Sequence, residues 1–432
     1  MQTYEEVISW IEGVPKYSKK DGLENIKKLM GRFGDPQLRY HVIHVAGTNG
    51  KGSCCAMLAR ILKCAGYKVG RYVSPHLVDY TERMSVNGAD IPREKFLELA
   101  RKVRAEAEAM QNGGENHPTF FELLTAIGFL WFAEEQVDWV VLETGMGGRL
   151  DSTNILPKPD LCLIASISLD HTKVLGSTVE AIAGEKAGIV KRGVPVVLGK
   201  NLPSVVSVIR AKAEELDAPF IYAGRVTEKI LGNDENGLRL NAAGEGFRYG
   251  GLYCPLSGDF QKDNLATVLC AAEELLRQGV IADRRTVRKG LASVRWPGRM
   301  QYADYRGRKF LLDGAHNPDA ARRLADYLEG LGRPVTLVFS ALAKKDVAGV
   351  LSELGGCPQI RRVIFAPLAA ESHAIPFAEA EQLWYTFRND VPILCACDTK
   401  HALDLAYGYE DALRVCAGSL YFVGEILALI RK

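Results

Sequence analysis

This sequence lacks the features that would place a protein in a membrane or on a polyanion. No apolar run approaches the ~20 residues that a membrane-spanning helix needs, and residues 1–13 lack the basic stretch and apolar core of a signal peptide. The 54 basic and 52 acidic residues nearly cancel and form no block of one sign, so nothing favours nucleic acid or an anionic membrane as a partner. We therefore expect a cytoplasmic protein with neither partner.

The cysteines lack the arrangement of a disulfide framework or a zinc site. Ten are scattered along the chain, and neither Cys54-Cys55 nor the Cys395/Cys397 pair has a second pair at zinc-ligand spacing. Several others lie within apolar stretches. We therefore expect reduced and mostly buried thiols.

Short segments with strand character alternate with helical stretches in the first part of the chain. Four of them predict buried strands, at 40–46, 139–142, 161–167 and 194–198. Helical patterns occur between them, for example at 53–65, and this alternation is typical of a mainly parallel sheet covered on both faces. Between 220 and 253 the segments become shorter and are separated by glycine-rich turns, which predicts a small antiparallel insertion.

A glycine-rich segment lies between the first predicted strand and its helix, where a phosphate-binding loop must be placed. It reads Gly47-Thr48-Asn49-Gly50-Lys51-Gly52-Ser53. Glycines let successive N–H groups point at phosphate oxygens, the helix N-terminus adds partial positive charge, and Lys51 adds a full charge. The hydroxyl of Ser53 suits Mg²⁺. Gly52 separates Lys51 from Ser53, unlike the common kinase and GTPase pattern, and by itself the segment also fits a plain glycine turn with an exposed lysine.

The chain is too long for one core: at ~150 residues per domain its length suggests two or three domains, and we expect two. Pro297-Gly298 is a strong local stop, and we place the boundary there, giving domains at 1–295 and 296–432. Further buried strands are predicted at 309–312, 335–339, 362–365, 391–395 and 420–423. The expected fold class is α/β: a P-loop domain with a mainly parallel sheet and a small antiparallel insertion, then a smaller Rossmann-like α/β domain.

Three polar residues outside the loop, Glu143, Asp170 and His171, are candidates for the same site. Glu143 and His171 follow predicted strands, so both are expected at the carboxyl edge of the sheet, where open α/β folds bind ligands. Asp170 is a candidate to orient the ring of His171. From position alone, a surface salt bridge for Glu143 and a structural role for His171 stay open. The sequence by itself favours an ordinary helix lysine at Lys186, paired with Glu185 or solvent.

Together these segments resemble a known family. The GTNGKGS loop is similar to the ATP loop of folylpolyglutamate synthases and dihydrofolate synthases, which are relatives of the Mur peptide ligases. Five further segments resemble motifs of that family: 74–77 (SPHL), 143–154 (ETGMGGRLDSTN), 168–172 (SLDHT), 185–189 (EKAGI) and 313–318 (DGAHNP). Each match alone is weak, but the set spans nearly the whole chain and is highly specific.

The resemblance implies an ATP- and Mg²⁺-dependent ligase that adds L-glutamate to folates, and also to dihydropteroate, through an acyl phosphate with release of ADP and phosphate. The second domain would hold glutamate, and a monomer is the default. One or two Mg²⁺ ions would bind at Ser53, Ser74, Glu143, His171 and Lys186. Lys186 would be carbamylated by CO₂, because an ammonium group beside divalent cations would be repelled, and metal charge and burial favour the neutral amine that reacts.

The resemblance also implies roles for the remaining candidate residues. The catalytic residues would be Lys51, Glu143, His171, Lys186 and His316. The nucleotide would contact Thr48, Asn49, Gly50, Lys51, Gly52, Ser53, Asn264, Arg299 and Asp313. The pterin or pteroate would contact Thr119, Phe120, Phe121, Glu122, Leu150, Asp151 and Ser152. Arg299 also has a physical rationale, since an arginine beyond the domain boundary would clamp phosphate only when the domains close.

Two other functions stay open at this point. One is a different Mur-type amino-acid ligase, for instance one acting on a peptidoglycan precursor, against which the SPHL and 119–122 segments argue. The other is a P-loop kinase or ATPase, which would need no amino-acid acceptor. Neither the preferred folate form nor the length of the glutamate chain follows from the sequence.

Overall fold

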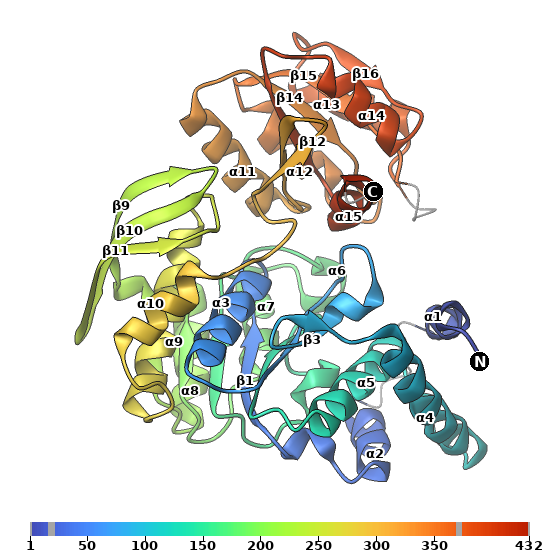
Figure 1. Cartoon of the computed structure of the whole chain (residues 1–432), viewed down its shortest axis with the longest axis vertical. Helices are drawn as coiled ribbons and strands as arrows, with labels where there is room; N and C mark the ends of the chain where they lie inside the picture. Colours follow the sequence, from blue (N-terminus) through green and yellow to red (C-terminus); the bar gives the residue numbers. More distant parts are fainter. Residues whose placement is uncertain (1, 16–21, 369–373, 431–432) are drawn as a thin grey trace.

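An eight-stranded sheet carries the phosphate loop and forms the larger body of the structure (Figure 1). The computed structural model describes residues 2–15, 22–368 and 374–430. The strands are β1 (His41–Ala46), β2 (Val69–Tyr72), β3 (Met84–Val86), β4 (Ala89–Asp90), β5 (Trp139–Glu143), β6 (Leu161–Ile164), β7 (Val196–Leu198) and β8 (Phe220–Tyr222). Their order is β4-β3-β2-β5-β1-β6-β7-β8, and only β3 pairs antiparallel with its neighbours. The loops after β1, β5 and β6 therefore meet at one edge.

Helices cover both faces of this sheet. They are α1 (Tyr4–Gly13), α2 (Glu24–Arg32), α3 (Lys51–Cys64), α4 (Arg93–Asn112), α5 (Phe120–Glu134), α6 (Thr172–Leu175), α7 (Val179–Ala187), α8 (Pro203–Glu215), α9 (Gln261–Arg277) and α10 (Arg284–Ala292). Because successive strand residues face opposite sides, Ile43 and Val45 of β1 pack with α3, α9 and α10, whereas Val42 packs with α4 and α5. The short 3₁₀ helices are η1 (Pro36–Leu38), η2 (Tyr80–Arg83), η3 (Ser152–Ile155) and η4 (Ala223–Arg225).

The predicted antiparallel insertion is a three-stranded ribbon that projects beside α9 and α10 (Figure 1). It consists of β9 (Thr227–Asp234), β10 (Gly237–Gly244) and β11 (Phe247–Cys254). The insertion is narrower than the predicted range of 220–253, because 220–222 form β8 and pair in parallel with β7 at the edge of the large sheet. A three-residue apolar run at a sheet edge is too short for its pairing partner to be read from the sequence.

A second, six-stranded sheet forms the C-terminal body, above the first in Figure 1. Its strands are β12 (Gln301–Tyr305), β13 (Arg308–Leu312), β14 (Val335–Phe339), β15 (Ile360–Phe365), β16 (Ile393–Cys395) and β17 (Leu413–Ala417), in the order β12-β13-β17-β14-β15-β16. All pairs are parallel except β12 with β13. Its helices are α11 (Pro318–Leu331), α12 (Val347–Gly355), α13 (Phe377–Phe387), α14 (Thr399–Tyr407) and α15 (Leu420–Ile430). The predicted α/β class is confirmed, whereas the domain division at 295/296 stays a prediction.

One predicted strand of this body is wrong. Residues 420–423 form the first turn of α15, and the strand in this region is β17, which lies between β13 and β14. Helix α15 is apolar over most of its length and is largely buried. A helix buried on most sides shows no amphipathic period, so a short apolar run within it cannot be told from a buried strand.

No helix in the described part of the chain combines the length and apolar character needed to cross a bilayer. All ten cysteines are free thiols, and most of them are buried. The predicted absence of a disulfide framework therefore agrees with the packing, in which thiols fill apolar cores.

The contact between α3 and α10 gives a test of the packing beside the phosphate loop. A Cβ atom at Gly290 of α10 would lie 2.6 Å from Cα of Ile61 in α3, so the backbones must separate to admit it. We expect Gly290→Ala to lower the free energy of unfolding by ~1–3 kcal/mol, the cost of overpacking a core. Thermal or urea unfolding of the whole chain measures the change.

The matched control is Gly31→Ala in α2, where a Cβ atom meets nothing within 4 Å. This change should leave stability unchanged or raise it by up to ~1 kcal/mol, because alanine restricts the unfolded chain. Equal effects of the two substitutions would contradict the packing described for α3 and α10.

Candidate functional site

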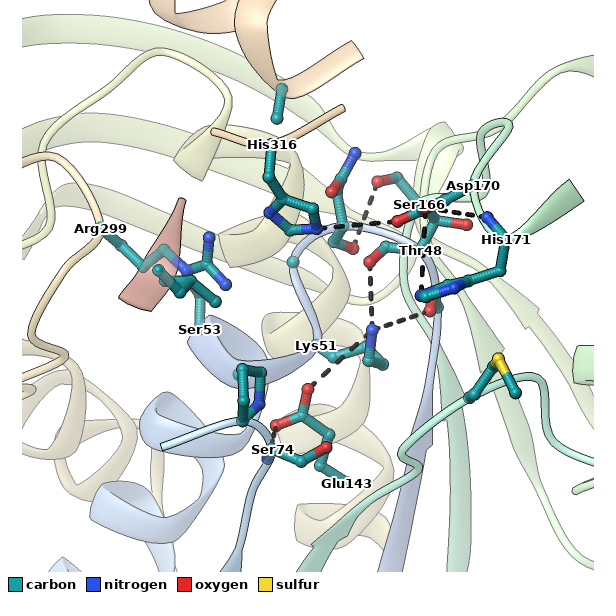
Figure 2. A pocket seen from close by; sticks show the side chains of 18 of the residues that line it. Thr48, Lys51, Ser53, Ser74, Glu143, Ser166, Asp170, His171, Arg299 and His316 are labelled. Atoms are coloured by element: carbon teal, nitrogen blue, oxygen red, sulfur yellow. Dashed lines mark hydrogen bonds and ion pairs between the residues drawn. The ribbon is translucent and has the colours of Figure 1, made fainter. Parts of the chain in front are cut away.

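A cavity of about 160 Å³ lies between the carboxyl edge of the eight-stranded sheet and the C-terminal body (Figure 2). All residues predicted to bind nucleotide or metal, or to act in catalysis, line it. From the larger body come Thr48, Asn49, Gly50, Lys51, Gly52, Ser53, Ser74, Glu143, His171, Lys186 and Asn264. From the C-terminal side come Arg299, Asp313 and His316. The fold thus brings together groups that lie up to 268 positions apart, as between Thr48 and His316.

The loop between β1 and α3 has a conformation that only glycine accommodates at several positions. Gly50, the N-cap of α3, has φ +86°, a left-handed value that strains other residues. A Cβ atom at Gly50 would lie 2.3 Å from Oδ1 of Asn264, and one at Gly52 would lie 2.4 Å from the Trp296 ring. Gly52, the residue that departs from the common P-loop pattern, therefore makes room for Trp296.

Lys51 is folded back over this loop and lies at the centre of the site (Figure 2). Its Nζ atom donates to the carbonyl oxygens of Gly47 (3.0 Å) and Thr48 (3.1 Å) and lies 3.9 Å from Oε1 of Glu143. Glu143 is buried at the end of β5, and its Oε2 accepts a hydrogen bond from the backbone N–H of Ser74 at 3.4 Å. Burial raises the pKa of Glu143, and the charge of Lys51 opposes that rise.

Lys186 is buried in α7, and its Nζ atom donates to the carbonyl oxygen of Gly47 at 2.8 Å. The simpler interpretation from sequence, an exposed lysine paired with Glu185, is wrong, because Glu185 pairs with Arg149 at 2.9 Å. Burial and the nearby charge of Lys51 lower the pKa of Lys186 to about 7. A substantial fraction of this amine is therefore neutral at physiological pH.

His171 lies at the start of the short helix α6, in the left-handed region with φ +51°. Burial and the positive charge of Lys345 lower the pKa of His171 to about 4, so the ring is neutral at pH 7. The expectation that Asp170 orients this ring is not met, because Asp170 lies 3.9 Å from Nε2 of His171 and bonds instead to Lys345 at 2.9 Å. A neutral imidazole keeps a lone pair for a ligand.

Two residues of the larger body, Asp170 and Asn49, make polar contacts with the C-terminal body beside the cavity. Oδ1 of Asp170 accepts from Nζ of Lys345, and its Oδ2 lies 3.6 Å from Nε2 of His316 (Figure 2). Asn49 of the phosphate loop donates to Oδ2 of Asp319 at 2.8 Å and accepts from the side-chain amide of Asn317 at 3.1 Å. Burial raises the pKa of Asp170, but the nearby His316 ring and the charge of Lys345 hold it well below its usual range.

The C-terminal groups are fixed by their own backbone contacts. Oδ2 of buried Asp313 accepts from the N–H of Met300 at 2.9 Å, and burial raises the pKa of Asp313 against the opposing charge of Arg299. Nδ1 of His316 lies 2.8 Å from the carbonyl oxygen of Gly314. Because a carbonyl only accepts, Nδ1 carries the proton and the Nε2 atom faces Asp170.

On the opposite side, Asn264 donates to Oε1 of Gln261 at 2.8 Å, and Gln261 donates to Oγ of Ser53 at 3.4 Å. All three side chains are buried. Ser53 is therefore oriented through Gln261, a residue that the sequence did not single out.

The sequence and the structure both match known proteins. Residues 299–429 match the family model for the C-terminal domain of dihydrofolate synthetase. The chain is 39% identical to the dihydrofolate synthase/folylpolyglutamate synthase of Bacillus subtilis over 98% of both chains, and 34% identical to the Escherichia coli protein of the same name over 98% of this chain and 94% of that one. The chain belongs to the folylpolyglutamate synthase/dihydrofolate synthase family.

Solved structures of the family agree in fold. The Mycobacterium tuberculosis folylpolyglutamate synthase complexed with ADP superposes with a TM-score of 0.89, at 29% identity and over 99% of this chain and 98% of that one. A folylpolyglutamate synthase complexed with AMPPCP and folate superposes with a TM-score of 0.86, at 30% identity and over the full length of both chains.

The residues predicted to contact the pterin do not line this cavity. Thr119 and Glu122 form the capping box of α5, in which Oε2 of Glu122 accepts from the Thr119 N–H at 2.7 Å. Asp151 is buried and accepts from Met146 and Thr153, which closes the turn before η3. The ring of Phe121 packs on Gly145, whose loop borders the cavity. The predicted role of Thr119, Phe120, Phe121, Glu122, Leu150, Asp151 and Ser152 therefore stays a prediction.

Several residues of the site were missed from the sequence: Gln261, Asn317, Asp319, Arg323 and Lys345. Asn317 lies within a recognised motif, but the others are isolated polar residues on helices or loops. Their function depends on which surface they face across the cleft, and spacing along the chain carries no such information.

The bridge between Lys345 and Asp170 gives a prediction about stability. Both side chains are largely buried, at 17% and 13% exposure, so Lys345→Ala leaves an uncompensated carboxylate. We expect a loss of ~3 kcal/mol in the free energy of unfolding, measured by thermal melting of the whole chain. Because the pKa of Asp170 is depressed, this loss is full at neutral pH and shrinks as the pH falls below the ordinary range of a carboxyl group.

Lys344→Ala is the control, since Lys344 is the exposed neighbour and its removal deletes the same charge. A melting temperature that falls equally in both variants would show that the bridge contributes nothing beyond net charge.

Proposed function

We propose that this protein is an ATP-dependent ligase that forms an amide between L-glutamate and the carboxylate of a folate, and also of dihydropteroate, with release of ADP and phosphate. The observation that carries the proposal is the convergence of the phosphate loop, Glu143, His171 and Lys186 with Arg299, Asp313 and His316 on one cavity. The names of the relatives from Bacillus subtilis and Escherichia coli support both acceptors.

The chemistry explains why such a ligase needs ATP. A carboxylate does not accept an amine at neutral pH, because it would have to expel oxide. Transfer of the γ-phosphoryl group to a carboxylate oxygen gives ADP and an acyl phosphate, and the amine of glutamate then attacks the acyl carbon and expels phosphate. Lys51 and, from across the cleft, Arg299 supply positive charge where phosphate charge develops. Closure between the two bodies excludes water that would hydrolyse the acyl phosphate.

The donor atoms around the cavity fit Mg²⁺. No cluster of three or more histidine, cysteine and acidic side chains occurs in the described part of the chain, so the ion would be held by the hydroxyls of Ser53 and Ser74, by Glu143, by neutral His171 and by nucleotide oxygens and water. Magnesium prefers oxygen ligands and keeps several waters. When bound, it neutralises the charge on the phosphate oxygens.

Lys186 fits carbamylation. Its Nζ atom is buried, lies within hydrogen-bond distance of the phosphate loop, and has a pKa lowered to about 7. In this step the neutral amine attacks CO₂, a C–N bond forms and one proton is released, so that a neutral group becomes an anion. The anionic carbamate would supply an oxygen donor beside Lys51 and the metal, where an ammonium group is repelled.

We also propose that the reaction takes place in the cytoplasm, in accord with ten free thiols and the reducing conditions found there. The active unit is proposed to be a monomer.

The other candidate functions, another Mur-type ligase and a P-loop kinase or ATPase, differ from this proposal in the acceptor that the reaction requires. Purified protein with ATP, Mg²⁺ and glutamate is offered dihydropteroate or tetrahydrofolate, and products are identified by mass spectrometry. Addition of one glutamyl unit to either supports the proposal, whereas ATP hydrolysis independent of glutamate and folate contradicts it.

Lys51→Ala should abolish most of the ATP-dependent ligation while preserving the fold. Its ammonium group is the full positive charge on the phosphate loop, and we expect a fall in kcat/KM of about 10²-fold or more. The rate of ADP formation in the presence of glutamate and folate measures the effect. Unchanged activity with an unchanged circular dichroism spectrum would rule out this role of the loop.

Lys186→Ala should nearly abolish turnover, because both the carbamate and its oxygen donor are lost. In wild-type protein supplied with ¹³C-labelled bicarbonate, a carbamate carbonyl signal should appear in the ¹³C NMR spectrum and be missing from the variant. A wild-type kcat in Lys186→Ala, or no carbamate signal in the active wild-type enzyme, would refute the modification.

A further inference from the structure

A second cavity lies behind the phosphate loop, on the far side of α3. Its volume is about 870 Å³, within the range of sites that bind small organic ligands. It is bordered by α3, by β2 and β3, by the segment 292–297 and by the start of β12. Nothing in the proposed chemistry uses this cavity.

The lining of the cavity is strongly basic. Five of its side chains are cationic, namely Arg60, Lys63, Arg71, Arg295 and Arg299. Only two are carboxylates: Asp90 lies near Arg71, and Glu235 already pairs with Lys309. An excess of fixed positive charge within a concave surface raises the local concentration of anions.

Three buried polar atoms of the lining have no hydrogen-bond partner in the described residues. They are Nε of Arg71, Oγ of Ser85 and Nε1 of Trp296. Ser85 is only 1% exposed, and the guanidinium of Arg71 lies 5.0 Å above the Trp296 ring. A buried polar atom without a partner is costly, so these three atoms give the wall of the cavity unused hydrogen-bonding capacity.

The other cations keep donors available. Arg60 donates one hydrogen bond to Ser293 at 3.1 Å, and Lys63 donates one to the carbonyl oxygen of Asn87 at 2.6 Å. Each bond uses a single donor of a group that carries several. The remaining N–H groups can therefore bind carboxylate oxygens as charge-assisted hydrogen bonds.

We propose that this cavity binds the γ-linked glutamyl chain of a folate polyglutamate, an inference that rests on the proposed function. The cations are distributed around the cavity, on α3, β2 and the 292–299 segment, which suits an extended chain of spaced carboxylates better than one compact phosphate. Apolar side chains between them, such as Ala56, Ala59 and Leu256, contact the methylene groups of such a chain.

Two residues connect this cavity to the ATP cavity. Arg299 lines both of them. Trp296 packs directly on Gly52 of the phosphate loop, where a Cβ atom would come within 2.4 Å of its ring. A glutamyl chain bound against Trp296 and Arg299 is thus held beside the site where the next glutamate is added.

The test is the binding of γ-linked tri- and tetraglutamate, measured by calorimetry on the full chain saturated with Mg²⁺ and ADP, so that the phosphate loop is occupied. We expect one peptide per chain. The double variant Arg60→Gln/Lys63→Gln should weaken binding about tenfold or more, since each lost contact is a charge-assisted hydrogen bond. The control Arg285→Gln/Lys289→Gln removes the same charge from exposed positions of α10 outside the cavity and should change little.

No peptide binding, or binding equally affected in both double variants, overturns the proposal. Inorganic phosphate that binds in place of the peptides, with the same sensitivity to Arg60→Gln/Lys63→Gln, overturns it as well and assigns a phosphate site. The first glutamate addition to tetrahydrofolate should persist in both double variants, because none of the four residues lines the ATP cavity. Failure of that reaction in the wild type would refute the proposed function, which separates the two hypotheses.

Discussion

The charge of Lys51 is the interaction on which the state of the whole site depends. Its Nζ atom lies 3.9 Å from Oε1 of buried Glu143 and opposes the rise in the pKa of that group that burial causes. The same charge contributes to the lowered pKa values of Lys186 and His171, which leaves an amine and an imidazole neutral near physiological pH. One ammonium group, positioned by two loop carbonyls, thus influences the pKa of a carboxyl group, an amine and an imidazole around itself.

That arrangement requires the phosphate loop to approach neighbouring side chains closely, which explains the glycines in the loop. Gly50 and Gly52 let the phosphate loop pass against Asn264 and Trp296, because a Cβ atom at Gly50 would lie 2.3 Å from Asn264 and one at Gly52 would lie 2.4 Å from Trp296. Polar contacts join the two bodies at this edge: Asn49 of the phosphate loop is bonded to Asp319, and Asp170 of the loop after β6 is bonded to Lys345. The contacts that join the two bodies therefore involve the same loops that form the charged site.

In the proposed second site, fixed positive charge would likewise recognise a longer substrate. A polyglutamate product differs from its precursor by added glutamyl units, each with one further carboxylate, so basic groups away from the reacting atoms are suited to recognise the longer chain. Arg60, Lys63 and Arg71 line such a region behind α3, and Arg299 joins it to the ATP cavity. The proposed polyglutamate site and the catalytic site would then share one wall.

The sequence by itself determined the local elements that depend on residues close together in the chain. The phosphate loop between a strand and a helix, the carboxyl-edge positions of Glu143 and His171, the parallel sheets and the antiparallel ribbon all follow from short-range pattern. The strand predicted at 420–423 is wrong, because a short apolar run at the start of the largely buried α15 resembles a buried strand. Only the tertiary structure decided that Lys186 is buried against Gly47, that Asp170 pairs with Lys345 instead of orienting the His171 ring, and that Trp296 fills the space left by Gly52. These facts concern burial and facing surfaces, which arise when distant segments pack together and have no signature in the spacing of residues along the chain.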